Sequence, residues 1–255
     1  MNDPKKFATN IATSDKTSIT VRGKDLVGEL IGQRTFTEML FFALAHRMPQ
    51  AGETRVLDGC LVTLMEHGWT PSSIVTRLMA DSTPGQAQVA IAAGLLAVGD
   101  VFAGTMDGCA RLLAAGVEAA DTASWCRETV AYHRTNRMPM PGFGHPFHKP
   151  DDPRPPRLFA VAAEAGYSGR YIALLRELGT EFDRAAGRHL TINATGAIAA
   201  LLLEIGIPLV AMRAVAVVSR AGGLAGHVVE ESQAPAAREI WRLADDGVPY
   251  VDPAN

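Results

Sequence analysis

Hydrophobic residues recur at intervals of three and four along most of the chain from Lys24 onward, which is the spacing of one face of an α-helix. Leu26, Leu30 and Ile31 begin this pattern, and glycine or proline residues interrupt it at short intervals. The sequence has no sustained alternation of hydrophobic and polar residues and no Asn-Gly or Asp-Gly pair between two apolar runs, which are the usual signals of strands and hairpins. The pattern therefore predicts an all-α fold.

Punctuation residues set the bounds of the predicted helices. Thr70 followed by Pro71 is typical of an N-cap with a proline in the first turn, so a helix is expected from there to about Asp81. Residues 1–17 lack the helical pattern and are expected to form a flexible or loosely docked arm. Further helices are expected over 86–98, over 110–134 as one or two helices, and over 158–165, 170–186, 191–205, 209–232 and 236–244.

Composition and charge narrow the class of protein. Hydrophobic residues make up 47% of the 255 positions but aromatic residues only 6%, while 40 Ala and 24 Gly allow helices to approach one another closely. With 24 basic and 27 acidic residues the net charge is −3, so no global field attracts nucleic acid or an anionic membrane. No charge-free apolar run is long enough to span a membrane, and the first residues lack the apolar core of a secretory signal. We expect a cytoplasmic protein.

The number and spacing of the cysteines are consistent with a cytoplasmic protein. Cys60, Cys109 and Cys126 are odd in number and widely spaced, which argues against a disulfide framework or a structural zinc site. We expect them to be buried apolar side chains in a reducing environment.

Candidate chemistry is concentrated in a proline-rich segment. Seven of the 15 prolines fall within residues 138–156, and no helix can run through that segment. Gly142 and Gly144 permit positive φ and would let a ligand meet bare backbone N–H groups. His145 can donate to a carbonyl oxygen or carry a proton near neutral pH, and the planar guanidinium of Arg154 suits a carboxylate. The alternative is a rigid surface loop in which the histidine has no role.

The same segment carries a family resemblance. Gly142-Phe143-Gly144-His145, with Arg154 nine residues after the histidine, resembles the GFGH…DPR signature of the citrate synthase superfamily. The short length and the segment 193–200 most resemble the compact citryl-CoA lyase branch. Further segments in the same order resemble other motifs of the family: 21–32, Glu66-His67-Gly68 with Pro71-Ser72, 92–100 and 219–230.

The resemblance implies an architecture and an assembly. The fold would be citrate-synthase-like, with a large helical domain from residues 18–94 and 206–255 and a small, CoA-facing helical domain from residues 95–205. The active-site cleft would lie between the two domains, and the protein would be a homodimer. The segments 199–203 and 215–218 are apolar over more than one stripe, as expected of helices buried on several sides.

The resemblance also implies roles for individual residues. His145 would bind the carbonyl or hydroxyl oxygen of oxaloacetate or citrate, while His67, Arg154 and Arg220 would hold the oxo-acid and its carboxylates. No tightly bound cofactor is expected, because coenzyme A thioester would be a substrate. The backbone of Pro141, Gly142, Phe143 and Gly144 would pass the CoA, and Lys149 and Arg137 would meet its phosphates, the last two by charge and position alone.

Two positions depart from the family pattern. Phe102 stands where the family has an enolisation histidine, and Thr195 stands where it has the aspartate that removes the acetyl proton. A phenyl ring cannot hydrogen-bond an enolate oxygen, and a neutral hydroxyl is not a proton acceptor near pH 7. Asp100, Asp107 and His148 are possible substitutes, although each is equally explained as a surface group.

The spacing His145-x-x-His148-x-x-Asp151 would also fit a metal site, but Pro146 and Pro150 restrict the convergence of these side chains. We expect no metal. The favoured function is a carbon–carbon lyase or acyltransferase of the citryl-CoA lyase type, acting on an acyl-CoA and an oxo-acid. The alternatives are altered chemistry on a related acyl-CoA and a pseudoenzyme that only binds a CoA thioester or a polycarboxylate.

Overall fold

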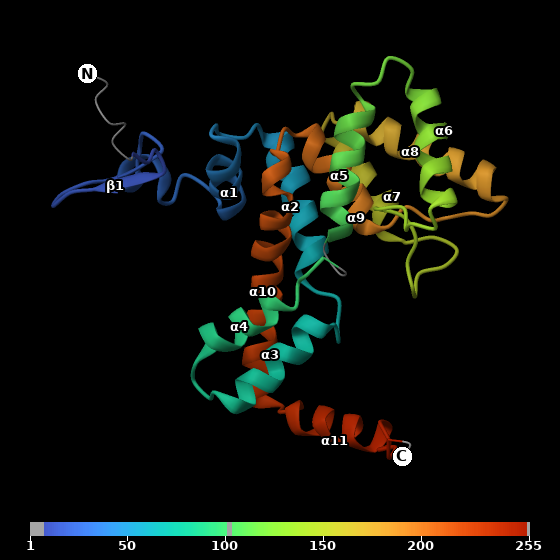
Figure 1. The fold of residues 1–255 in the computed structure, drawn as a ribbon. Helices are drawn as coiled ribbons and strands as arrows, with labels where there is room; N and C mark the ends of the chain where they lie inside the picture. Colours follow the sequence, from blue (N-terminus) through green and yellow to red (C-terminus); the bar gives the residue numbers. More distant parts are fainter. Residues whose placement is uncertain (1–7, 101–103, 254–255) are drawn as a thin grey trace, which may run out of the picture.

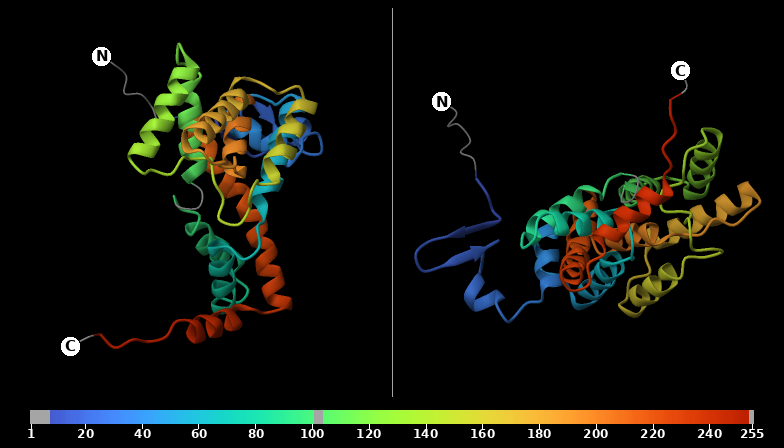
Figure 2. Two further views of the ribbon diagram at one scale, coloured as in Figure 1. Left: turned by 90° about the vertical axis from the view of Figure 1, so that its right-hand side faces the viewer. Right: turned by 90° about the horizontal axis from the view of Figure 1, so that it is seen from below.

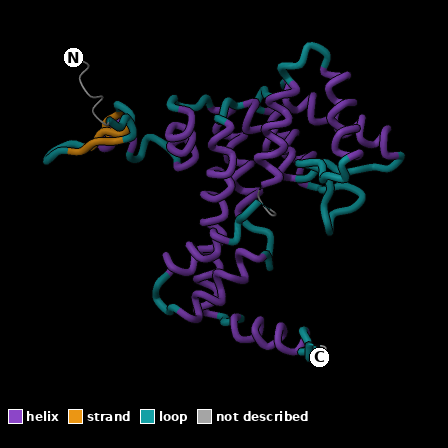
Figure 3. Tube along the Cα trace, in the orientation of Figure 1, coloured by secondary structure: helices purple, strands orange, loops and turns teal. Residues whose placement is uncertain are grey.

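Helices dominate the computed structural model, which describes residues 8–100 and 104–253 (Figures 1 and 3). This confirms the all-α prediction. The described α-helices are α1 (Phe36–Ala45), α2 (Ala51–Met65), α3 (Pro71–Ser82), α4 (Ala87–Leu96), α5 (Gly104–Gly116), α6 (Thr122–Thr135), α7 (Arg154–Glu164), α8 (Arg170–Ala186), α9 (Ala194–Glu204), α10 (Met212–Gln233) and α11 (Ala237–Gly247). Shorter helical turns, η1 (Leu26–Leu30) and η2 (Leu209–Ala211), precede α1 and α10.

A small antiparallel sheet near the N-terminus differs from the sequence prediction. Its strands are β1 (Ala12–Ser14), β2 (Ile19–Val21) and β3 (Lys24–Asp25), in that spatial order. Arg22 (φ 46°) and Gly23 (φ 80°) make the turn between β2 and β3, and positive φ at both positions is typical of a type I′ hairpin. The strands are too short to show an alternating pattern, and the turn carries Arg-Gly in place of Asn-Gly. Ala12–Ser14 form a strand that the sequence pattern did not predict, while the flexible or loosely docked arm over residues 1–17 stays a prediction.

Prolines explain where two helices begin. α3 begins at Pro71 after its cap Thr70, as predicted. α7 begins at Arg154, before the predicted start at Leu158, and Pro155 lies in its first turn. Proline is tolerated there because the first N–H groups of a helix have no intrahelical acceptor.

The main core is built around α9. Its residues Gly196–Leu202 are all buried, as predicted for a helix covered on several sides, and it packs against α2, α5, α7 and α8. A side-chain carbon at Gly196 would lie 2.3 Å from the carbonyl oxygen of Gly142. The small residue at position 196 therefore lets α9 touch the backbone of the proline-rich loop.

A second group of helices extends from this core. α3 and α4 pack against each other and against α10, and α11 packs on α3 and projects away from the other helices (Figures 1 and 2). One continuous apolar core joins parts of α1, α2 and α10 with α5 to α9, so it contains residues from both predicted domains. The division into domains 18–94 with 206–255 and 95–205 remains a prediction.

The segment Leu209–Gln233, which includes α10, is long and apolar enough by length and composition to cross a membrane. A single helix of this kind is weak evidence, because the core helices of water-soluble proteins pass the same test. α10 packs against α2, α3, α4 and α5, and it carries the buried polar residues Ser219 and Glu231. These contacts are typical of a core helix.

The cysteines are free and buried, as predicted. Burial raises the pKa of the Cys60 and Cys109 thiols to about 12. Neither is a thiolate near neutral pH, so both act as apolar packing groups.

Candidate functional site

The turn between α2 and α3 carries His67. Glu66 caps the end of α2, and its Oε1 accepts the backbone N–H groups of His67 at 2.8 Å and Gly68 at 2.7 Å. Gly68 has φ 68°, a conformation that glycine adopts without steric cost. The hydroxyl of Ser73 in α3 donates to the carbonyl of Gly68 at 2.9 Å. The backbone of His67 is therefore held at both sides of the turn.

The proline-rich loop pairs with the residues that precede α9. The N–H of Gly144 donates to the carbonyl of Thr191 at 2.7 Å, and the N–H of Asn193 donates to the carbonyl of Gly142 at 3.0 Å. Both glycines have positive φ, 84° at Gly142 and 77° at Gly144, as expected. The expectation that a ligand meets bare N–H groups is wrong for Gly144, because its N–H is already bonded to Thr191.

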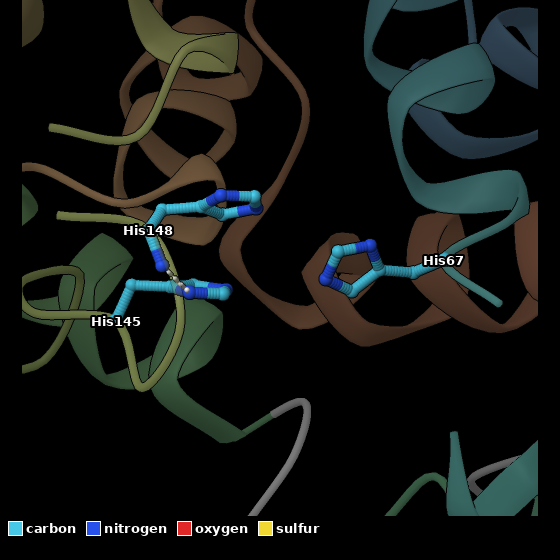
Figure 4. Close-up of side chains that lie close together, drawn as sticks. All are labelled: His67, His145 and His148. Atoms are coloured by element: carbon cyan, nitrogen blue, oxygen red, sulfur yellow. Dashed lines mark hydrogen bonds between the residues drawn. The ribbon is translucent and has the colours of Figure 1, made fainter. Parts of the chain in front are cut away.

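Three histidine rings from these two segments face one another (Figure 4). The rings of His145 and His148 stack with centroids 4.3 Å apart, and the ring of His67 lies 6.0 Å from His145 and 5.8 Å from His148. One ring nitrogen from each residue lies within 4.8 Å of the other two. The family resemblance placed His67 with His145, whereas His148 was a possible substitute and a member of the candidate metal motif.

Hydrogen bonds assign the proton of His145. Its Nδ1 accepts the backbone N–H groups of Phe147 at 3.2 Å and His148 at 3.0 Å, so the neutral ring carries its proton on Nε2. Burial, with the charges of His148 and Arg154, holds the pKa of His145 below its ordinary value. Burial, with the charge of Arg154, likewise lowers the pKa of His67. Near neutral pH both rings are therefore neutral, and His145 offers an N–H donor.

This proton placement bears on whether the cluster could hold a metal. A metal on Nε2 of neutral His145 would place the ring proton on Nδ1, against two N–H donors. Asp151, the third residue of the candidate motif, is bonded instead to Nε2 of His189 at 2.8 Å. The arrangement suits an oxygen acceptor better than a cation.

Arg154 is oriented by the buried Asp152. Its Nε and Nη2 donate to the two carboxylate oxygens of Asp152 at 2.9 Å and 2.8 Å. Asp152 also accepts the N–H of Ala194 at 3.0 Å, which ties this pair to the start of α9. Burial alone would raise the pKa of Asp152, but the hydrogen bonds from Arg154 and from backbone N–H groups outweigh it and lower that pKa. Asp152 is therefore a carboxylate at neutral pH.

Arg220 on α10 completes the cationic set. Its side chain is 15% exposed, and among the described residues its buried Nη1 has no hydrogen-bond partner. The Oε1 of Glu66 lies 3.9 Å away, beyond hydrogen-bond reach. His67, His145, Arg154 and Arg220 all line one cavity of about 600 Å³. The four residues predicted to hold the oxo-acid thus line one cavity although they come from three separate segments.

Thr195, one of the two predicted departures, lines the same cavity. Its hydroxyl donates to Oδ1 of Asn193 at 2.7 Å, so the hydroxyl of Thr105, 3.0 Å away, is left to donate to Thr195. No Asp or Glu lines the cavity within the described part of the chain. Phe102, the other departure, lies outside the described residues.

The predicted CoA-binding residues are divided. Phe143 and Gly144 line the cavity. Pro141 and Gly142 do not, because they pack against α5 and α9: a side-chain carbon at Gly108 would lie 3.1 Å from Pro141, and one at Gly142 would lie 2.6 Å from the Cys109 sulfur. The remaining two, Lys149 and Arg137, are exposed and outside the cavity wall.

The two acidic substitutes are used elsewhere. Asp100 and Asp107 both pair with Nη2 of Arg213, at 2.6 Å and 2.8 Å. Neither lines the cavity. His148 does not line the cavity either, but its ring stacks on that of His145, which does.

Comparison with known families tests the resemblance. The family model described as citrate synthase, C-terminal domain, matches residues 5–244. The chain belongs to the citrate synthase family. Because the match includes His67, His145, Arg154 and Arg220, this member of the family carries the whole predicted oxo-acid set within the matched region.

Solved structures give the same assignment for this citrate synthase family member. Citryl-CoA lyase from Hydrogenobacter thermophilus is 27% identical with a TM-score of 0.88, and the match covers 98% of this chain and 96% of that one. ATP citrate lyase from Methanothrix soehngenii, in complex with citrate and coenzyme A, is 16% identical with a TM-score of 0.82, covering 100% and 43%. Citrate synthase from Thermoplasma acidophilum, with carboxymethyl coenzyme A and oxaloacetate, is 18% identical with a TM-score of 0.67, covering 89% and 61%. These last two show the fold alone. No curated protein matches the chain in sequence.

Sequence reasoning assigned no role to several residues that hold the site. Glu66 and His227 lie inside segments that carry the resemblance, and the seven-residue spacing of Arg220 and His227 would have placed them on one face of α10. His189 bonds Asp151 of the proline-rich loop at 2.8 Å and Asp183 of α8 at 2.5 Å. No local pattern predicts the contact of His189 with Asp151, because the two residues are 38 positions apart in the sequence.

Proposed function

We propose that this cavity binds an oxo-acid and an acyl-CoA, and that the protein cleaves or forms the carbon–carbon bond between them in the manner of a citryl-CoA lyase. One observation carries the proposal: the buried Nη1 of Arg220 lacks a partner among the described residues and lies beside His67, His145 and Arg154 in one cavity. A carboxylate of the ligand would supply the missing hydrogen-bond acceptor. The similarity to a citryl-CoA lyase over 98% of the chain supports the same proposal.

The contacts suggest a role for each polar group. Nε2–H of His145 would donate to the carbonyl or hydroxyl oxygen of the ligand, because its Nδ1 is occupied by two backbone donors. Nη1 of Arg220 would bind a carboxylate. Asp152 occupies Nε and Nη2 of Arg154, which leaves Nη1 of Arg154 for the ligand. His67 would be a further carboxylate contact.

In the cleavage direction the tertiary hydroxyl loses its proton, the carbon–carbon bond breaks, and its electron pair passes to the thioester enolate. A carbonyl remains on the oxo-acid, and the enolate carbon then takes a proton from water. His145 already carries a proton on Nε2, so another group must accept the hydroxyl proton. We assign this to His148, whose ring stacks on His145 at 4.3 Å, either directly or through one water molecule. Its proton then returns to solvent.

The CoA thioester would enter past Phe143 and Gly144, which line the cavity. Pro141 and Gly142 would support this backbone from behind, and Lys149 and Arg137 would meet the CoA phosphates, by charge alone. The thioester is a substrate in this proposal, and no tightly bound cofactor is required. The acyl group itself could be larger than acetyl, which is the altered-substrate alternative.

Thr195 favours a second candidate, a family member that binds these ligands without catalysis. Its hydroxyl is occupied by Thr105 and Asn193, and no described carboxylate lines the cavity, so the group that would protonate or deprotonate the acetyl carbon is missing. In that case the protein would serve as a binding or regulatory subunit.

Calorimetric titration with CoA, acetyl-CoA, oxaloacetate and citrate separates these candidates, when combined with a citryl-CoA cleavage assay. Binding with turnover supports the lyase, and binding without turnover supports the second candidate or a different acyl group. Binding of none of the four ligands would contradict both.

We further propose a homodimer. Large apolar side chains are exposed on η2, α10 and α11, including Val210 (92% exposed), Val229 (55%) and Trp241 (70%), and burial against a second copy would remove them from water. Sedimentation equilibrium should give a mass of twice 27.1 kDa. A monomer at micromolar concentration would contradict this proposal.

A further inference from the structure

A chain of hydrogen bonds runs from a buried arginine to the turn that carries His67. Arg77 on α3 is 2% exposed. Its Nη1 bonds Oε2 of Glu231 at 3.0 Å, its Nη2 pairs with Glu230 at 2.5 Å, and its Nε donates to Nδ1 of His227 at 3.1 Å. These three partners lie on α10, so one guanidinium joins α3 to α10.

The hydrogen bond from Arg77 determines which nitrogen of His227 carries the proton. Because Nδ1 of His227 accepts from Arg77, the neutral imidazole carries its proton on Nε2. That nitrogen faces Oε2 of Glu66 at 3.1 Å. The other oxygen of Glu66 accepts the N–H groups of His67 and Gly68. The chain therefore leads from Arg77 through His227 and Glu66 to the backbone of His67.

The same carboxylate is close to the second oxo-acid residue. Oε1 of Glu66 lies 3.9 Å from Nη1 of Arg220, near enough to balance its charge and too far to occupy it as a hydrogen-bond partner. Helix packing sets this distance: a side-chain carbon at Gly223 of α10 would lie 2.0 Å from the carbonyl oxygen of Met65, so α10 touches the end of α2 directly. The buried pair of Arg77 and Glu231 and the exposed partners Glu66 and Glu230 each contribute little net stability, and stability alone therefore does not account for this arrangement.

We propose that Glu66 and His227, oriented by Arg77, are positioning residues that hold His67 and Arg220 so that both meet the same carboxylate of the oxo-acid. The inference rests on the proposed function, because it concerns the same cavity. Neither Glu66 nor His227 needs to touch the ligand. Their effect is on affinity, through the geometry of the two residues that do.

The test compares two substitutions of His227 that differ in their ability to hydrogen-bond. His227→Gln keeps an acceptor for Arg77 and a donor for Glu66, whereas His227→Leu keeps neither. Calorimetry with oxaloacetate should show Kd raised about tenfold in H227L and within about threefold of wild type in H227Q, with the Kd for CoA unchanged in both. Both variants lose the imidazole, so their thermal midpoints should fall by similar amounts. The Kd for oxaloacetate should therefore depend on whether the side chain at position 227 can hydrogen-bond, and not on the stability of the variant.

A matched charge-removal variant provides the control. Glu230 is 63% exposed and pairs with Arg77, but within the described part of the chain it makes no hydrogen bond or ion pair with His227 or the turn of His67, so Glu230→Gln should leave the Kd for oxaloacetate unchanged. Glu66→Gln places an amide N–H opposite the N–H donor of either His227 or His67, so it should weaken binding as H227L does. This variant replaces H227L in the test if H227L fails to fold. If H227Q weakens oxaloacetate as much as H227L, or if neither H227L nor E66Q weakens it, the positioning role is wrong. If the wild-type protein itself binds neither oxaloacetate nor citrate, the proposed function fails instead.

Discussion

The cavity is lined by two sets of residues that differ in how their polar groups are used. One set comprises His67, His145, Arg154 and Arg220, and the other centres on Thr195 with Thr105. In the first set, one buried hydrogen-bond donor is still available, because Nη1 of Arg220 has no partner among the described residues. In the second set, the hydroxyl of Thr195 is already bonded to Asn193 and Thr105.

This difference separates binding from chemistry. A buried donor without a partner costs free energy, so the first set indicates a ligand that supplies acceptors. A satisfied pair of hydroxyls has no such requirement and offers no proton acceptor near neutral pH. Under the proposed function, the first set would hold an anion, and proton transfer would depend on the histidines among the described residues.

The largest expected effect comes from changing the second set. Phe102→His combined with Thr195→Asp would restore the two family groups, and the Thr105 hydroxyl can donate to the new carboxylate. Turnover of citryl-CoA should rise by about 10²–10⁴-fold. Thr195→Asn in place of Thr195→Asp is the control, since it has similar size without a base. An unchanged rate with intact ligand binding would show that the missing groups do not limit the reaction.

Removing one cation from the first set should abolish most of the binding. Arg220→Gln is expected to raise the Kd for oxaloacetate about 100-fold, or about 2.7 kcal/mol, because a charge-assisted bond in a largely buried site is lost. Arg213→Gln is the matched control on the same helix: Arg213 pairs with Asp100 and Asp107 and does not line the cavity. Equal Kd values for the two variants would contradict the anion site.

His148 should separate chemistry from binding within the histidine cluster. His148→Gln is expected to lower kcat for citryl-CoA cleavage about 100-fold with little change in the Kd for oxaloacetate. His148→Ala should regain part of its rate when free imidazole is added, because the lost group is a proton acceptor. Absence of rescue together with a normal kcat in H148Q would remove His148 from the mechanism.

Proton uptake should accompany anion binding. Burial lowers the pKa of both His67 and His145, so the free protein holds these rings neutral until the pH falls below the ordinary histidine range. A bound carboxylate favours the charged ring of His67 and raises its pKa, so affinity for citrate should increase as pH falls from 8 toward 6, by at most about tenfold per unit for one proton taken up. His145 should stay neutral, because its Nδ1 accepts two backbone N–H groups. Calorimetry in buffers of different ionisation enthalpy measures the protons directly. His67→Asn should reduce the uptake.

The smallest effect concerns the anchoring of the proline-rich loop. Hydrogen bonds to Asp183 and Asp151 raise the pKa of His189. Its contribution to stability should therefore be complete below the unfolded pKa of about 6.5 and should disappear as pH rises through the raised folded value. Thermal midpoints of wild type and His189→Asn should differ by about 1–3 °C at pH 6 and converge at high pH. A difference that grows with pH would contradict this assignment.

Local signals were sufficient for most of the helices. The N-cap and proline at Thr70-Pro71 predicted the start of α3, and the apolar run at 199–203 predicted that α9 is buried on several sides. The sheet of β1 to β3 could not be predicted in this way, because its strands have two or three residues and depend on backbone pairing across turns. The sequence pattern treats proline as a helix breaker, but proline also fits the first turn of a helix. For this reason α7 begins earlier than predicted.

By itself, the sequence determined the family, because its motifs resemble those of citrate synthases in the same order, and that resemblance singled out His67, His145, Arg154 and Arg220 as a candidate set. Only the tertiary structure decided how those residues are held and which of their atoms are available. The N–H of Gly144 is used by Thr191, Asp152 orients Arg154, and Arg77 reaches His67 through His227 and Glu66. Arg77 and His227 are 150 residues apart. Such bonds depend on how α3, α10 and the end of α2 pack together, and that packing leaves no signature in a local stretch of sequence.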